Sequence, residues 1–178
     1  MPKTYQSCDI DVEDLIAVVM TQHHPDLAEH KVSVQAVYVS NESELLGQTP
    51  AIMQRGHSCA AQIKITSLEQ RSRGFADALL TIDTLGWVGM PPPMREALVD
   101  HELTHLELVL DKKTESVKID DLGRPRLKIR HHSWELSGFS DVCERHGENA
   151  LESKAISRFI ADYAQLELFP TTKEKEKP

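Results

Sequence analysis

Residues 94–110 read MREALVDHELTHLELVL and follow three consecutive prolines at positions 91–93. A proline suits the first position of a helix, where no backbone N–H bond is needed, and it blocks a continuing strand. Leu98, Leu106 and Val109 supply apolar packing along this stretch. The sequence therefore predicts that the strongest helix of the chain begins here.

Residues 101–105 of this predicted helix read HELTH, which is the pattern HExxH. His101 and His105 would stand one turn apart on the same face, so both imidazoles can reach one ion. Glu102 would lie about 100° further round the axis, where its carboxylate can reach a water on the metal without becoming a ligand. The motif predicts a Zn²⁺ site with His101 and His105 as ligands and Glu102 as the catalytic acid–base, and Asp100 could orient a ligand histidine.

A catalytic zinc normally has three protein ligands and one open position, so a third ligand must come from elsewhere. The downstream candidates are His131, His132, Glu135 and His146. If residues 124–130 form a strand, Leu127 and Ile129 share a face with His131. Strand phase therefore favours His131, provided that the apolar face points at the helix.

Three segments together resemble the phage metallopeptidase family, which is related in pattern to SprT-like zinc proteases. They read ADALLTID (76–83), REALVDHELTHLELV (95–109) and RLKIRHHSWELSGFSDVCERHG (126–147), and the resemblance covers roughly residues 60–150. In that family a histidine precedes a phenylalanine and an arginine-rich helix that ends near glycine. The resemblance implies His132 as the third ligand, with His131 as the alternate, followed by Phe139, Val142, Arg145 and Gly147. Ser133 stands where the family usually has aspartate.

The remaining patterns predict an α+β fold, in which a mixed β-sheet packs against the HExxH helix and against N- and C-terminal helices. Helical spacing marks residues 11–21, 135–145 and 150–166, and β-branched runs mark strands at 32–39, 59–65 and 76–83. Residues 116–120 and 124–130 read as a hairpin, and residues 41–57 as a surface excursion. We expect one zincin-like domain over residues 1–164 and a tail over 165–178 that ends in disorder.

Composition is ordinary for a globular protein, with 178 residues, 40% of them hydrophobic and 27% charged. No secretory signal and no apolar run of membrane-spanning length is present in the sequence, so we expect a cytoplasmic location. The three cysteines are too few and too scattered for a disulfide framework. A net charge of −8 disfavours non-specific binding to nucleic acid.

Residues 165–169, QLELF, resemble the peptide by which bacterial DNA-processing proteins dock on the replication sliding clamp. The residues that would make the contact are Gln165, Leu166, Leu168 and Phe169. The other interpretation is that these apolar side chains close the core at the end of the last helix. A smaller contact with phosphate or with an acidic peptide could come from Arg126, Lys128 and Arg130, although such alternation is more often a solvated strand face.

The sequence thus favours a zinc metallopeptidase that hydrolyses peptide bonds. By resemblance to SprT-like proteins, its substrates would be DNA-associated proteins at replication sites. The alternative is a metal-stabilised, non-catalytic adaptor that docks on the sliding clamp. The intact Glu102 argues against loss of activity, and a single HExxH glutamate does not suit a two-metal nuclease.

Overall fold

A computed structural model describes residues 3–43, 47–54, 57–132 and 138–154 of the chain. These residues form a mixed α/β structure built on one sheet. Its strands are β1 (Lys3–Ser7), β2 (Val34–Ser43), β7 (Ala78–Asp83) and β6 (Ala61–Ile65), in that spatial order, with β3 (Gly47–Thr49) paired to the end of β2. Strand β2 runs parallel to β7, and the other pairs are antiparallel.

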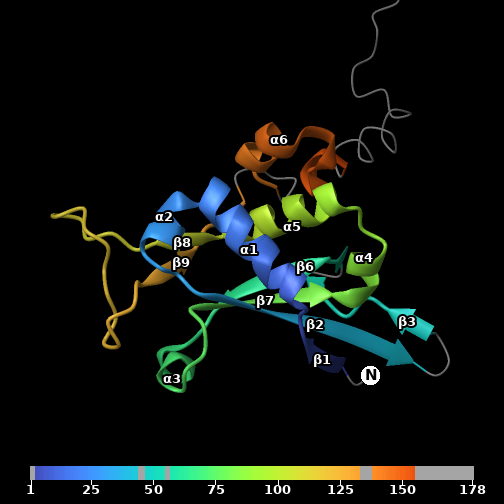
Figure 1. The fold of residues 1–178 in the computed structure, drawn as a ribbon, viewed down its shortest axis with the longest axis horizontal. Helices are drawn as coiled ribbons and strands as arrows, with labels where there is room; N and C mark the ends of the chain where they lie inside the picture. The colour runs from blue at the N-terminus through green and yellow to red at the C-terminus, as the bar shows by residue number, and fades with distance from the viewer. Residues whose placement is uncertain (1–2, 44–46, 55–56, 133–137, 155–178) are drawn as a thin grey trace, which may run out of the picture.

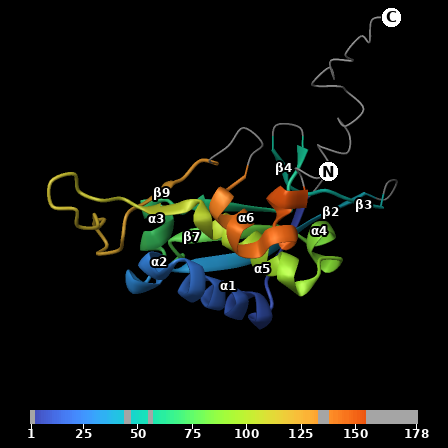
Figure 2. The same cartoon turned by 90° about the horizontal axis from the view of Figure 1, so that it is seen from above.

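Two helices cover one face of this sheet (Figure 1). They are α1 (Ile10–His23) and α5 (Pro92–Thr104), which pack against each other and against β2 and β6 respectively. A shorter helix, α6 (Ser140–His146), lies on the side of α5 away from the sheet, as Figures 1 and 2 both show. The remaining short helices are α2 (Pro25–Glu29), α3 (Leu68–Ser72), α4 (Thr84–Val88) and a 3₁₀ turn at Gly147–Asn149.

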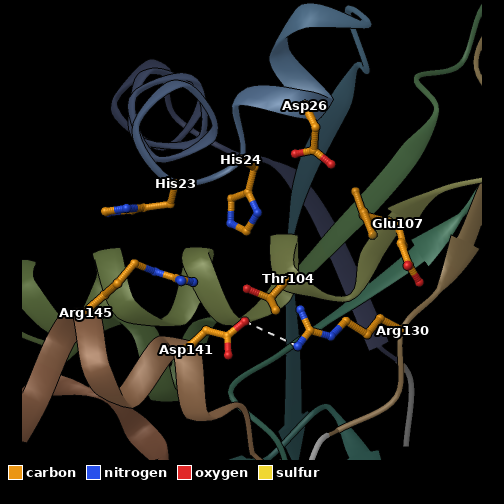
Figure 3. Close-up of a pocket in the computed structure, with 9 residues that line it drawn as sticks. His23, His24, Asp26, Thr104, Glu107, Arg130, Asp141 and Arg145 are labelled. Carbon is orange, nitrogen blue, oxygen red and sulfur yellow. Dashed lines mark hydrogen bonds and ion pairs between the residues drawn. The ribbon is translucent and has the colours of Figure 1, made fainter. Parts of the chain in front are cut away.

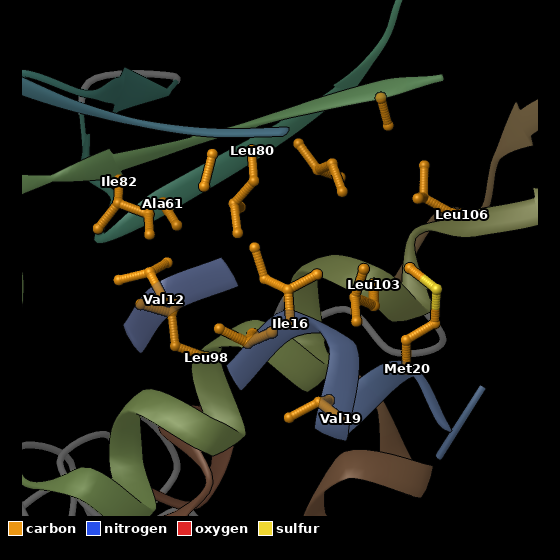
Figure 4. Close-up of a cluster of buried hydrophobic side chains, with 14 of the residues drawn as sticks. Val12, Ile16, Val19, Met20, Ala61, Leu80, Ile82, Leu98, Leu103 and Leu106 are labelled. Carbon is orange, nitrogen blue, oxygen red and sulfur yellow. The ribbon is translucent and has the colours of Figure 1, made fainter. Parts of the chain in front are cut away.

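The main core lies between the sheet and the two helices (Figure 4). Helix α1 contributes Val12, Ile16 and Val19 at helical spacing, and the strands contribute Leu80 and Ile82. These side chains are at most 4% exposed, which is where burial of apolar surface contributes most to folding. Helix α5 is thus held between the core on one side and α6 on the other.

The expected mixed sheet is present, and strands occur where residues 32–39, 59–65 and 76–83 predicted them. The excursion over 41–57 was predicted to be only a surface segment, and this was wrong in part. It carries β3 and the small ribbon of β4 (Met53–Gln54) with β5 (His57–Ser58), and its Ala51 and Ile52 are buried. The Asp83 carboxylate explains this burial, because it accepts the backbone N–H groups of both residues.

The predicted helix over 94–110 was too long at its end. Helix α5 stops at Thr104, and β8 (Leu106–Leu108) pairs with β9 (Leu127–Ile129) in an antiparallel ribbon. The predicted hairpin between 116–120 and 124–130 is reduced to a single bridge, Ile119 with Pro125, because residues 127–129 take β8 as their partner. Of the predicted C-terminal helices, α6 occupies the described end of 135–145, and residues 151–154 are helical. The predicted domain boundary at 164 lies outside the described residues.

Candidate metal centre

Helix α5 presents His101 and His105 side by side. Pro91 caps the helix and prolines occupy its first turn, while His105 is the residue at its C-terminal end and keeps helical backbone angles. The two ring centroids are 5.2 Å apart, as expected for side chains one turn apart on the same face. The early end of the helix therefore leaves the spacing of the histidine pair intact.

His132 joins this pair from the segment that follows β9. The Arg130 N–H donates to the His105 carbonyl at 2.7 Å, which holds this segment against the end of α5. The His132 Nε2 atom then lies 3.2 Å from Nε2 of His101. One nitrogen from each of the three histidines lies within 4.8 Å of the other two. His131 is exposed and belongs to no cluster of potential ligands among the described residues.

The other ring nitrogens of the two helix histidines are already occupied. Nδ1 of His105 lies 2.7 Å from the Arg130 carbonyl oxygen, and because a carbonyl only accepts, Nδ1 carries the proton. Nδ1 of His101 lies 2.5 Å from Oε1 of Glu152. These partners leave the Nε2 lone pairs of both rings directed to the shared centre, which is the usual arrangement of metal-binding histidines.

Burial lowers the pKa of His105 to about 4, with the charges of His101 and His132 adding to the effect. The pKa of His132 is also lowered, by burial first and by His101 second. Both rings are therefore neutral at pH 7, the form that binds metal. For His101, burial lowers the pKa, but the hydrogen bond that it donates to Glu152 and the charge of Glu102 outweigh this effect, and the net shift of the pKa is upward.

Glu102 lies on the sheet side of α5, at the edge of β6. Its side chain is buried, and Oε2 accepts the backbone N–H of Ile63 at 2.8 Å. Burial raises the pKa of this carboxyl, although His101 and the Ile63 N–H oppose the shift. A carboxyl with a raised pKa next to histidines that could hold a metal ion is suited to accept and return a proton.

Phe139 closes the centre on one side. Its ring is fully buried and packs against all three histidines, with centroid distances of 4.8 to 5.1 Å. The Arg130 guanidinium lies over the same ring, 5.2 Å from its centroid. An apolar wall of this kind lowers the local dielectric and strengthens the electrostatic contacts inside the centre.

Asp100 does not hydrogen-bond His101, His105 or His132 in the described structure. Its fully buried carboxylate instead accepts from His24 at 2.8 Å, from His146 at 2.7 Å and from two nitrogens of Arg145 at 2.9 Å. Burial alone would raise the pKa of Asp100, but these bonds outweigh it and hold the pKa well below its usual value. His23, Asp100 and His146 also lie close enough to hold an ion, yet each Asp100 oxygen already accepts from at least two donors.

A polar pocket of about 340 Å³ opens beside this cluster, between the end of α1, β8 and α6 (Figure 3). Both acidic and basic side chains line it, and Arg130 pairs with Asp141 at 3.3 Å across one wall. The predicted basic face of β9 is largely neutralised in the same way, because Lys128 pairs with Glu107 at 3.1 Å. Arg126 is exposed at the other end of that strand.

Two predicted features fall outside the described residues. They are Glu135, a candidate third ligand, and the QLELF segment with Gln165, Leu166, Leu168 and Phe169.

The donor set fits a divalent metal ion. Two ligands at the zinc–nitrogen distance and the tetrahedral angle stand about 3.3 Å apart, and the His101 and His132 nitrogens are separated by 3.2 Å. Imidazole suits zinc, copper, iron and nickel better than it suits magnesium or calcium. The buried Glu152 Oε2 atom, which has no hydrogen-bond partner among the described residues, adds negative charge close by.

The fold and the centre together define a mixed α/β protein in which the end of helix α5 and the segment after β9 bring together three histidines that could hold a metal ion, next to a buried acid. A sequence model of the family described as "Putative phage metallopeptidase" matches residues 4–164, and the chain belongs to this family. Comparison with curated proteins gave no match, and comparison with solved structures gave none either. Within the described ranges, no helix has the length and apolar character needed to cross a membrane.

Sequence reasoning missed Glu152 and the roles of the histidines around Asp100. Glu152 sits in a stretch that reads only as an amphipathic helix, and it lies 51 positions from the histidine it contacts. His24 belongs to no sequence motif, but it is buried and donates to Asp100. No spacing rule links such distant positions, so these contacts follow only from the tertiary packing of α1, α5 and α6.

Proposed function

We propose that the protein is a zinc-dependent peptidase in which His101, His105 and His132 hold the ion and Glu102 is the general base. The observation that carries the proposal is the convergence of three imidazole nitrogens within 4.8 Å, next to a buried carboxyl. Bound zinc would supply a Lewis acid that activates water and polarises a peptide carbonyl. Three histidine ligands would leave one position of a tetrahedral ion open for this chemistry.

Glu102 performs the proton transfer in this proposal. The carboxylate takes a proton from the attacking water and delivers it to the leaving amine. Burial raises the pKa of this carboxyl above its ordinary value, which makes it a better proton acceptor than an exposed glutamate. The Ile63 N–H holds one oxygen, which fixes the side chain relative to the histidines.

The outer edge of strand β6 is a second feature that favours a peptide as the substrate. The backbone groups of Ala60 and Thr66 form hydrogen bonds with the β7 side of the sheet. The residues between them alternate, so the backbone N–H and C=O groups of Ala61, Ile63 and Ile65 point away from β7. No strand pairs with that side in the described part of the chain. Glu102 already accepts the Ile63 N–H, so an extended peptide could add to the remaining backbone groups of this edge, beside the acid.

The decisive experiment compares zinc content and peptide cleavage in the wild type and in Glu102→Gln. We expect unchanged zinc binding and a loss of kcat by a factor of about 100 or more, because general acid–base catalysis typically contributes 10²–10⁴. Glu107→Gln is the matched control, since Glu107 is exposed on β8 and pairs with Lys128. A wild type that binds zinc but cleaves neither unfolded nor DNA-bound protein would favour the non-catalytic adaptor.

The substrate and partner are part of the same proposal. Residues 165–169, QLELF, would dock on the bacterial sliding clamp, and the SprT-like resemblance points to DNA-associated proteins as substrates. Sliding clamps act in the bacterial cytoplasm, where the enzyme would then work. Clamp binding by the full chain should be lost in the double variant Leu168→Ala, Phe169→Ala, while cleavage of a free peptide stays unchanged. Equal clamp binding by both proteins would remove this part of the proposal.

A further inference from the structure

Glu152 makes two contacts that connect the end of the described chain to the metal centre. Its Oε1 lies 2.5 Å from Nδ1 of His101 and accepts the backbone N–H of Phe139 at 3.4 Å. The residue follows the 3₁₀ turn after α6 and is only 4% exposed. One carboxylate thus holds both a candidate ligand ring and the backbone of the residue whose ring contacts all three histidines.

Burying a carboxylate such as Glu152 costs free energy, which a purely structural contact would not require. Removing an ionised group from water carries a penalty of several kcal/mol unless charge or hydrogen bonds compensate it. Among the described residues, Oε1 has these two partners and Oε2 has none, although both oxygens are buried. A cation at the Nε2 side of His101 would provide the missing compensation through the ring.

The charges of the centre also favour a cation beside His101. Three neutral imidazoles leave a divalent ion with its full charge of +2. The buried carboxylate of Glu152, which contacts Nδ1 of His101, would offset part of this charge. His105 differs, because its Nδ1 is held by a neutral carbonyl. Of the two histidines on α5, only His101 therefore has a carboxylate as the partner of its Nδ1 atom.

We infer that Glu152 is a positioning residue for the metal centre: it fixes the ring of His101 with Nε2 directed at the ion and increases the affinity of that ligand for the metal. The inference rests on the proposed function, since it assumes that His101 binds a metal. Carboxylate partners of metal-bound histidines act in this way in general, and losing one typically weakens metal binding about 10- to 100-fold.

The test measures zinc affinity of the full chain by competition with a chelator. We expect Glu152→Ala to bind zinc about 10- to 100-fold more weakly, and Glu152→Gln to fall between, because the amide oxygen can still accept from Nδ1 but carries no charge. Glu148→Gln is the control, since Glu148 is an exposed acid four residues earlier. Unfolding of each apo protein, followed by circular dichroism, shows that the variants are folded.

A second arm separates positioning of His101 from general support of the fold. In a His101→Ala background, Glu152→Gln should weaken the residual zinc binding no further, because the two residues act as a unit. The inference would be overturned if folded Glu152→Gln and Glu152→Ala bound zinc as tightly as the wild type. It would also be overturned if Glu152→Gln weakened zinc binding by the same factor in the His101→Ala background as in the wild type. Failure of the wild type itself to bind zinc would instead overturn the proposed function.

Discussion

At the scale of single residues, the choice between His131 and His132 decides how the centre is assembled. The two are neighbours in a strand-like segment, so they point in opposite directions and only one can face the α5 histidines. Strand phase in the sequence favoured His131 on the assumption that the face of Leu127 and Ile129 is the buried one. Ile129 is in fact 40% exposed, so the assumption behind that interpretation does not hold.

We predict that His132→Ala abolishes stoichiometric zinc binding, whereas His131→Ala retains it. The loss should exceed the roughly 10- to 100-fold effect typical of an outer hydrogen-bond partner, because a direct ligand is removed. Zinc content after dialysis, measured by atomic absorption, distinguishes the two. If His131→Ala instead lacks zinc and His132→Ala contains it, His131 and not His132 is the third ligand.

At the scale of elements, the end of α5 shows how tertiary pairing overrides a local pattern. Residues 106–110 read LELVL, which fits an amphipathic helix and an alternating strand equally well. Pairing with β9 decides for the strand: Leu106 and Leu108 are buried, while Glu107 faces solvent. The start of α5 could be predicted because proline acts locally, but its end depends on residues some 20 positions away.

The Asp100 network ties α1, α5 and α6 together, and we predict that it is a main contributor to stability. Asp100→Asn should lower the free energy of unfolding by about 3–5 kcal/mol, since it removes the buried charge that pairs with the Arg145 guanidinium and accepts hydrogen bonds from His24 and His146. Asp141→Asn is the control, because Asp141 is partly exposed and pairs with Arg130 at 3.3 Å. Urea unfolding of both apo variants measures the difference.

The pH dependence follows from the same carboxylate. The pKa of Asp100 is held below its usual value in the folded protein, so the folded state resists protonation. Below about pH 4 the unfolded state takes up a proton that the folded state does not, and unfolding becomes more favourable. The stabilisation by Asp100 is therefore present above this pH and is lost as the pH falls toward the folded pKa. Asp100→Asn should lack this component of the acid-induced loss, which urea titrations at pH 3 to 6 would reveal.

At the scale of the whole molecule, the centre joins segments that are far apart in the chain. Helix α5, the segment after β9 and the turn after α6 all converge on it. The sequence could predict the helices and central strands, because their periodicity is local. It could not predict strand order, the pairing of β1 with β2 or the position of Glu152, because each depends on contacts between distant segments.

We predict that metal removal lowers the thermal stability of the whole chain. A ligand at about 100 times its Kd stabilises the folded state by about 2.7 kcal/mol, which corresponds to about 5–10 °C in Tm for a domain of this size. Differential scanning calorimetry with zinc and then with a chelator measures the shift. His101→Ala should show the same Tm in both conditions, and a shift that persists in it would place the stabilising metal elsewhere.

The hydrogen bond that Glu102 accepts from the Ile63 N–H makes the position of this acid observable by hydrogen exchange. An amide on the outer side of an edge strand normally exchanges its hydrogen with solvent quickly, because no neighbouring strand protects it. Ile63 is held by a buried carboxylate, so its N–H resonance should be long-lived in deuterated water while Glu102 keeps its position. A single backbone signal in the nuclear magnetic resonance spectrum would thus report the movements of the acid.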